Sequence, residues 1–127
     1  MQRSSTIAAI TALALGLVAF QYWNSARPAR NEPPLPALVR DLPKDAHAAE
    51  GVFRQRVARR FPKGTPEKAV ARELAAEGFL LGGEQGAWRS AALERGVFLC
   101  DIGWRVRWRA ENGKVTETSA SYGAACP

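Results

Sequence analysis

The chain of 127 residues has a single histidine, His47, and only two cysteines, Cys100 and Cys126. A zinc site would need several ligands from these residue types, and the C-x-x-C spacing typical of such sites is missing. A serine–histidine–aspartate catalytic triad would have to use His47, and the chain has no Gly-x-Ser-x-Gly motif to supply the nucleophile. We therefore expect no metal, no cofactor and no catalytic residues, and interpret His47 as a solvated residue at a helix start.

Phosphate loops and long basic blocks are also missing. Gly82, Gly83 and Gly86 are not followed by the Lys-Ser/Thr pair of a phosphate-binding loop. The net charge is +6, but lysine and arginine are spread along the chain rather than gathered in one run. This distribution favours a mildly basic exterior over a nucleic-acid-binding surface, and leaves open a weak attraction to anionic membranes or polymers.

One long apolar run stands at the N-terminus, over residues 7–20, and it carries no charge. Its length suits the hydrophobic part of a signal peptide, yet no small-x-small cleavage site follows. Extended over residues 4–23, with Tyr22 and Trp23 at the interface, it reaches the length of a spanning helix. We expect residues 1–24 to be an uncleaved transmembrane anchor, with a cleaved signal peptide as the alternative. The absence of a cysteine near the end of the run argues against a lipid anchor.

The orientation of this anchor depends on two opposing signals. Three arginines follow the run and only Arg3 precedes it, which favours a cytoplasmic C-terminal part (Arg27, Arg30 and Arg40 follow). The cysteine pair favours an oxidising compartment. Giving more weight to the cysteines, we expect a single-pass inner-membrane protein with its C-terminal domain in the periplasm, or a protein secreted to the periplasm after cleavage.

Residues 25–43 hold five of the eight prolines and are expected to form a stiff, solvated linker. The folded domain is expected over residues 44–127. It should begin with an amphipathic helix over 46–61, because apolar residues recur there at spacings of three and four until Pro62 stops the pattern.

A second helix should start after Thr65, with Thr65 as N-cap and Pro66 as the first helical residue. Gly78 should end it in a Schellman motif, in which Phe79 closes over Leu74. Both ends of this helix are thus specified by local sequence.

Strands fill the rest of the chain. We predict a strand over 87–93, a turn at 94–96, a short strand over 97–100, and two long alternating runs over 102–110 and 115–122. The predicted fold class is α+β, a two-layer sandwich of two helices packed on a three- to four-stranded antiparallel sheet.

The last two runs should form a hairpin, for which two registers compete. A two-residue turn at Asn112-Gly113 would set Trp108 opposite Glu117 and would not match the apolar faces. A three-residue loop over 111–113 pairs Trp108 with Thr116 and Arg107 with Glu117, and is preferred.

The preferred register brings Cys100 and Cys126 to the same face as diagonal neighbours, so we predict a disulfide between them. Closing that loop should stabilise the domain by about 3 kcal/mol.

Alternation in the first run separates apolar residues from a row of three arginines, Arg105, Arg107 and Arg109. Such a row is most often a solvated sheet face. It is also the candidate partner-binding site of this chain, for an acidic partner or a phosphate. Trp104 and Trp108 are expected in the core, and Trp88 either joins them or stays exposed.

The sequence Gly64-Thr65-Pro66-Glu67-x-x-Val70-x-x-x-Leu74, with Gly78-Phe79 and a C-terminal meander, resembles the SmpA/OmlA (BamE-like) family of outer-membrane assembly lipoproteins. The resemblance implies a small periplasmic domain with two helices on a three-stranded sheet, which binds partners and is not an enzyme. The family's lipobox cysteine and its Gly-x-Pro after the second helix are absent here. The chain is equally similar to uncharacterised small membrane-anchored proteins of proteobacteria that end in a Tyr-Gly…Cys-Pro tail.

These features together predict a non-enzymatic, membrane-anchored envelope protein that binds an envelope protein or an anionic polymer. Two alternatives stay open: an inhibitor of, or an enzyme on, cell-wall polymers, and a cytoplasmic-facing nucleic-acid binder that uses the arginine row.

Overall fold

The computed structural model describes residues 16–18, 32–97 and 99–127. The chain divides into two units, Met1–Pro34 and Leu35–Pro127. Within the described residues no helix is both long enough and apolar enough to cross a membrane. The anchor expected over residues 1–24 falls outside those residues except for a helical piece at 16–18, so the fold below is that of the second unit.

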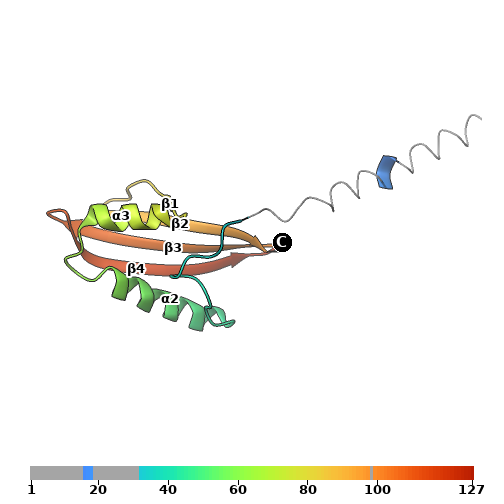
Figure 1. Cartoon of the computed structure of the whole chain (residues 1–127), viewed down its shortest axis with the longest axis horizontal. Coiled ribbons are helices and arrows are strands. Elements are labelled where there is room, and N and C mark those ends of the chain that lie inside the picture. The colour runs from blue at the N-terminus through green and yellow to red at the C-terminus, as the bar shows by residue number, and fades with distance from the viewer. Residues whose placement is uncertain (1–15, 19–31, 98) are drawn as a thin grey trace, which may run out of the picture. The chain divides into compact units, whose positions relative to one another are not determined.

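The second unit is an α+β domain with a four-stranded antiparallel sheet in the order β1-β2-β3-β4. Its elements are α2 (Ala46–Arg60), α3 (Glu67–Ala76), β1 (Leu80–Leu81), β2 (Trp88–Val97), β3 (Cys100–Glu111) and β4 (Lys114–Ala125). Helix α2 packs against β4 and helix α3 against β1 and β2 (Figure 1). The predicted fold class is confirmed at this level.

A single core joins the helices to one face of the sheet. Phe53 and Val57 of α2 and Val70 and Leu74 of α3 are fully buried, and they belong to one cluster with the apolar residues of β3. Because alternate residues of a strand point to the same face, both helices cover the same side of the sheet.

Residues 35–43 belong to the folded unit and not to a linker, and they contribute Leu38 and Val39 to its core. Leu38 and Val39 are 3 % and 2 % exposed, and the compact unit begins at Leu35. The Arg56 guanidinium donates to the carbonyl oxygen of Ala37 at 3.0 Å and to that of Arg40. The domain therefore starts earlier than the expected boundary at residue 44. The high proline content suggested a linker, but apolar residues between the prolines pack into the core.

Helix α3 begins differently from the prediction. The Thr65 hydroxyl donates to the Pro62 carbonyl oxygen at 2.6 Å, and no side chain caps the helix, which starts at Glu67. The Thr65 carbonyl instead accepts the Val115 amide at 2.8 Å, since the preceding loop pairs with the edge of β4. The prediction that Thr65 is the N-cap of this helix is therefore wrong.

The C-terminal end of α3 is as predicted. Gly78 has a φ of 92°, and the Phe79 amide donates to the Leu74 carbonyl at 3.0 Å, which is the hydrogen bond that defines a Schellman motif. Phe79 is buried at 2 % exposure, so the motif also places an aromatic ring in the core.

The β3–β4 hairpin adopts neither of the two registers considered. Asn112 and Gly113 have φ values of 53° and 74° and form a two-residue turn between Glu111 and Lys114. A β-bulge next to Arg109 and Ala110 then shifts the pairing, so that Trp108 faces Thr118. The predicted three-residue loop is wrong, but the bulge adds one unpaired residue, Thr116, to β4 and so keeps the apolar faces matched.

Strand β2 is longer than predicted. Glu94, Arg95 and Gly96 pair with residues of β3 rather than forming a turn, and β2 reaches Val97 opposite Cys100. The turn-like composition of 94–96 is outweighed by the continuous ladder with β3.

Candidate binding face

Strand β3 presents two different surfaces. Trp104, Val106 and Trp108 are buried on the side of the helices. The arginines between them point to the other side, which no helix of the described residues covers. We call this side the open face, made of Leu80 of β1, which pairs with Ala92, and of Trp88, Ser90, Ala92 and Glu94 of β2, Asp101, Gly103, Arg105, Arg107 and Arg109 of β3, and Glu117, Ser119 and Ser121 of β4.

The register of the three strands sets out the open face in rows. Arg109 lies between Trp88 and Glu117, Arg107 between Ser90 and Ser119, and Arg105 between Ala92 and Ser121; these rows follow the pairing of β3 with its two neighbours. Every neighbour of Arg105 and Arg107 in these rows is small. Their guanidinium groups are therefore not overhung by larger cross-strand side chains.

Trp88 belongs to the open face, which settles the alternative left by its sequence. The guanidinium carbons of Arg107 and Arg109 lie over the indole ring, 4.8 and 5.2 Å from its centroid. Such cation–π contacts are worth about 0.5–1 kcal/mol at exposed sites. They hold one end of the arginine row against the sheet.

The three arginines differ in their charge partners. Arg109 lies 3.7 Å from a carboxylate oxygen of Glu117, which is across from it in the ladder. The predicted pairing of Arg107 with Glu117 is thus wrong by one row, since the bulge shifts β4. Among the described residues no carboxylate lies within ion-pair distance of Arg105 or Arg107, so the positive charge of the open face is concentrated there.

Two hollows flank these unpaired arginines. One, of about 370 Å³, lies between the loop after β1 and the arginines; its lining includes Gly83, Gln85, Ser90, Arg105 and Arg107. The other, of about 240 Å³, includes Ala92, Glu94, Arg105 and Ser121 in its lining. Arg105 borders both, which leaves room beside it for a bound group.

An arginine on the covered side of the sheet, in contrast, has acidic partners. Arg89, the neighbour of Trp88 in β2, forms ion pairs with Glu67 of α3 and, at 3.0 Å, with Glu84. This cluster borders a cavity of about 440 Å³ beside α3. The Arg89 charge is thus compensated within the fold, whereas Lys68, which also lines this cavity, has no ion-pair partner among the described residues.

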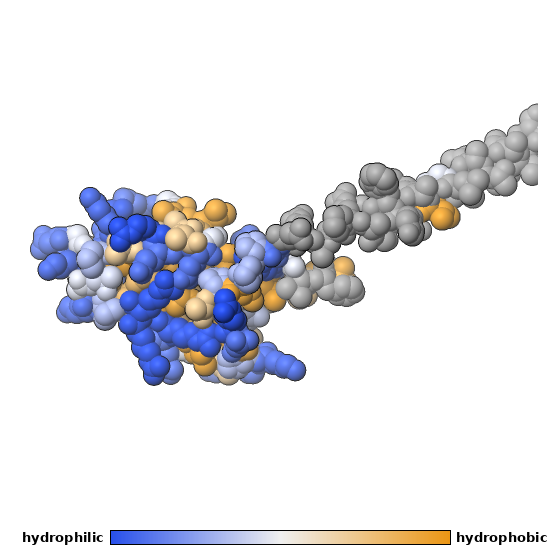
Figure 2. Space-filling model, viewed as in Figure 1, coloured by the Kyte–Doolittle hydropathy of each residue, from blue (hydrophilic) through white to orange (hydrophobic). Residues whose placement is uncertain are grey.

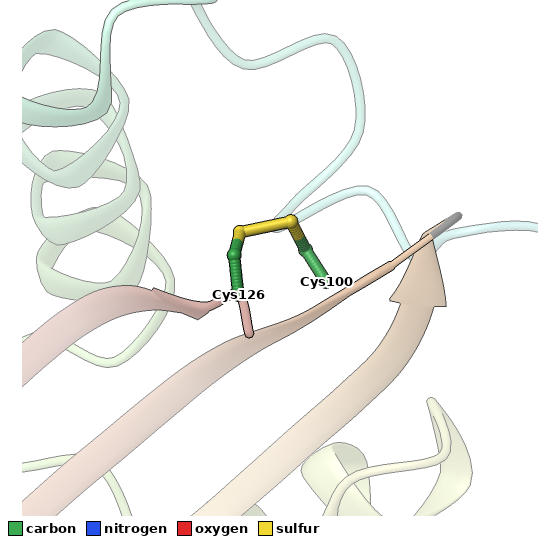
Figure 3. Close-up of a disulfide and its surroundings, with 2 residues drawn as sticks. All are labelled: Cys100 and Cys126. Carbon is green, nitrogen blue, oxygen red and sulfur yellow. A yellow bond between two sulfur atoms is a disulfide. The ribbon is translucent and has the colours of Figure 1, made fainter.

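The predicted disulfide is present: Cys100 and Cys126 are joined, with their Cα atoms 4.2 Å apart (Figure 3). It closes the hairpin at the end opposite the Asn112-Gly113 turn, where Cys100 begins β3 and Cys126 follows β4. Because the bulge shifts the register, the cysteines are directly opposite rather than diagonal. The disulfide joins strand ends and lies away from the arginine row.

Other features of the surface carry less chemistry. His47 is exposed at the start of α2, and the described residues contain no group of three potential metal ligands. An apolar patch near β1 is visible in Figure 2, where Leu80 and Leu81 are 78 % and 53 % exposed. The sequence pattern identified the arginine row but not its serine neighbours. Which serines flank the arginines depends on the pairing of β3 with β2 and β4, and the alternation within each strand does not fix that pairing.

Comparison with known proteins adds no relative: no family model, no curated protein and no solved structure matches the chain. The resemblance to the SmpA/OmlA family therefore stays a prediction.

Proposed function

We propose that this protein is a non-enzymatic, membrane-anchored envelope protein whose periplasmic domain binds another envelope component through the open face. Residues 4–23 anchor it in the inner membrane, and Arg105, Arg107 and Arg109 contribute the binding surface.

The observation that carries this proposal is the uncovered sheet face with two unpaired guanidinium groups. Guanidinium forms two parallel hydrogen bonds with a carboxylate or phosphate, and its rigid fork makes such pairing specific. A face that served only solvation could carry the same arginines, but the combination with flanking hollows and small neighbours favours a ligand. The disulfide supports the periplasmic location, because such bonds persist in oxidising compartments.

Site-specific photo-crosslinking in cells tests the binding face. A photoreactive residue is placed at Ser121 on the open face, with a matched control at Ala75, which is exposed on α3. We expect an envelope component to be captured from position 121 and not from position 75, and the capture to disappear in the Arg105→Gln/Arg107→Gln variant. Equal capture from both positions, or none from position 121, would contradict the proposal.

A reporter fused after Pro127 tests the location separately. We expect activity from a reporter that works only in the periplasm. Activity from a reporter that works only in the cytoplasm would refute the orientation.

A further inference from the structure

We propose that the ligand of the open face is an extended polypeptide segment with acidic side chains at two alternate positions, which pair with Arg105 and Arg107. The inference rests on the proposed function, in that it takes the open face as the binding surface, and it adds the chemistry and the spacing of the partner.

Spacing is the first reason for a peptide. Arg105 and Arg107 are two residues apart on one strand, so their Cα atoms are about 6.5 Å apart. Side chains on one face of any extended peptide repeat at the same distance. An extended segment lying along β3 therefore brings carboxylates at positions i and i+2 within reach of both arginine side chains at once.

The neighbours of the two arginines suit carboxylates. Ser90 and Ser119 flank Arg107, and Ser121 flanks Arg105. Hydroxyl groups donate hydrogen bonds to carboxylate oxygens that the guanidinium leaves unpaired. The hollows on either side of Arg105 give these carboxylates room to approach; each hollow is also lined by one acidic residue, Glu94 in one and Glu84, which pairs with Arg89, in the other.

The charge of the open face changes sign along β3. Past Arg105, the same face of β3 continues with Gly103 and the exposed Asp101, and Glu94 of β2 lies opposite Gly103. The positive end of the face is thus followed by a negative end. A matching segment carries a basic residue four positions beyond the acid that meets Arg105, where it reaches Asp101.

Other anionic ligands fit this face less well. Single-stranded nucleic acids bind by stacking bases on aromatic rings, and Trp88, which supplies the one aromatic ring among the described residues of the open face, already has two guanidinium groups over it. Insertion into a lipid surface uses several large apolar residues, whereas Leu80, at the β1 edge of the sheet, is the single large aliphatic side chain among the described residues of the open face.

The test measures binding of short fluorescent peptides to the full chain, purified in a neutral detergent at low ionic strength, by fluorescence anisotropy. The probe peptide has acids at alternate positions and a lysine four positions beyond, in serine-rich sequence, and is made in both chain directions. A permuted peptide of the same composition has its acids adjacent, so that in an extended chain they point to opposite faces.

We expect one direction of the probe peptide to bind about tenfold more tightly than the permuted peptide, and Arg105→Gln/Arg107→Gln to remove this difference. Lys68→Gln/Arg72→Gln, which removes two exposed cations of α3, is the matched control for net charge and should leave the preference intact. Arg109→Gln should reduce it less than the double change on the open face, since Glu117 already compensates Arg109.

Two results would overturn the inference. Equal binding of probe and permuted peptides would show a response to charge alone, and tighter binding of an oligonucleotide or of anionic vesicles than of the probe would show a different ligand class. If either occurs while crosslinking from position 121 still captures an envelope component, the proposed function stands and only the peptide chemistry fails. If crosslinking fails as well, the binding face itself is wrong.

Discussion

The two faces of β3 are built from neighbouring residues, yet one face is buried under the helices and the other is uncovered. On the covered face Trp104, Val106 and Trp108 are closed in by α2, α3 and residues 35–43. On the open face the arginines between them have serine and alanine as cross-strand neighbours, and Arg107 also lies over the ring of Trp88. One strand thus carries the stability of the domain on one side and its candidate recognition chemistry on the other. Substitutions on the covered face should therefore change stability, and substitutions on the open face should change binding.

The largest expected effect lies at the centre of the covered face. Trp108→Ala should lower the free energy of unfolding by about 3–5 kcal/mol, because it removes a side chain that is 2 % exposed and leaves a cavity. The measurement is denaturant unfolding of the full chain followed by circular dichroism. Trp108→Phe is the control: the indole nitrogen has no hydrogen-bond partner among the described residues, so losing it should cost much less. A loss below about 1 kcal/mol for Trp108→Ala would contradict the core role of the covered face, since large core truncations cost more than that.

Removing the disulfide should have the next largest effect. The Cys100→Ser/Cys126→Ser variant should lose about 3 kcal/mol, because the bond closes a loop with a sequence separation of 26 residues and restricts the unfolded chain. Chemical unfolding of the oxidised protein and of the variant gives the difference. Peptide binding by the folded variant should stay close to that of the native chain, since the cysteines lie away from the arginine row; a parallel loss of binding would contradict the separation.

A pair of glycine changes tests the helices that cover the sheet. Gly78→Ala should destabilise the domain by about 1–2 kcal/mol, because residue 78 has a φ of 92° in the Schellman motif that directs Phe79 inward. Gly51→Ala should stabilise it by about 0.5–1 kcal/mol, since Gly51 is inside α2 and a Cβ there meets no atom within 4 Å. Thermal unfolding of both variants should show shifts of opposite sign, and two shifts of the same sign would contradict these local roles.

The contact between α2 and the edge of β4 is expected to contribute less. A Glu50 carboxylate oxygen accepts the Tyr122 backbone amide at 3.3 Å, and the other oxygen pairs with Arg54 at 2.7 Å. Glu50→Ala should cost about 1 kcal/mol of unfolding free energy. Glu50→Gln keeps an oxygen acceptor and should cost less; hydrogen exchange at the Tyr122 amide should rise in the alanine variant, and an unchanged exchange rate would show that the bond does not protect it.

The sequence predicted the residues of the covered face better than it predicted the start of the domain and the register of the hairpin. Period-two alternation in β3 identified Trp104 and Trp108 as core, and Gly78-Phe79 identified the end of α3, because these signals are local. The role of residues 35–43 was missed, since their burial depends on contacts with α2 that no local pattern encodes. The bulge in β4 was missed for a similar reason: a one-residue insertion in a turn or in a strand gives the same alternation of faces.

The candidate site was predicted only in part. The arginine row was visible as alternation, but its uneven charge pairing depends on the bulge, which moves Glu117 opposite Arg109 rather than Arg107. The place of Trp88 depends on the register between β2 and β3, which residues 88–94 do not fix alone. Cross-strand partners thus decided which arginines are free for a ligand, and they follow from the tertiary pairing.

The smallest expected change in stability is at Arg105, directly beside Val106 in the chain. Arg105→Gln should alter the free energy of unfolding by no more than about 0.5 kcal/mol, because its guanidinium has no carboxylate partner among the described residues and points away from the core. The same change should weaken capture from position 121 in cells, so that recognition and stability respond independently. Denaturant unfolding gives the first quantity and the crosslinked fraction the second. A loss of stability as large as that expected for Glu50→Ala would mean that the open face carries part of the fold, and the arginine row would then be structural rather than a surface kept for a partner.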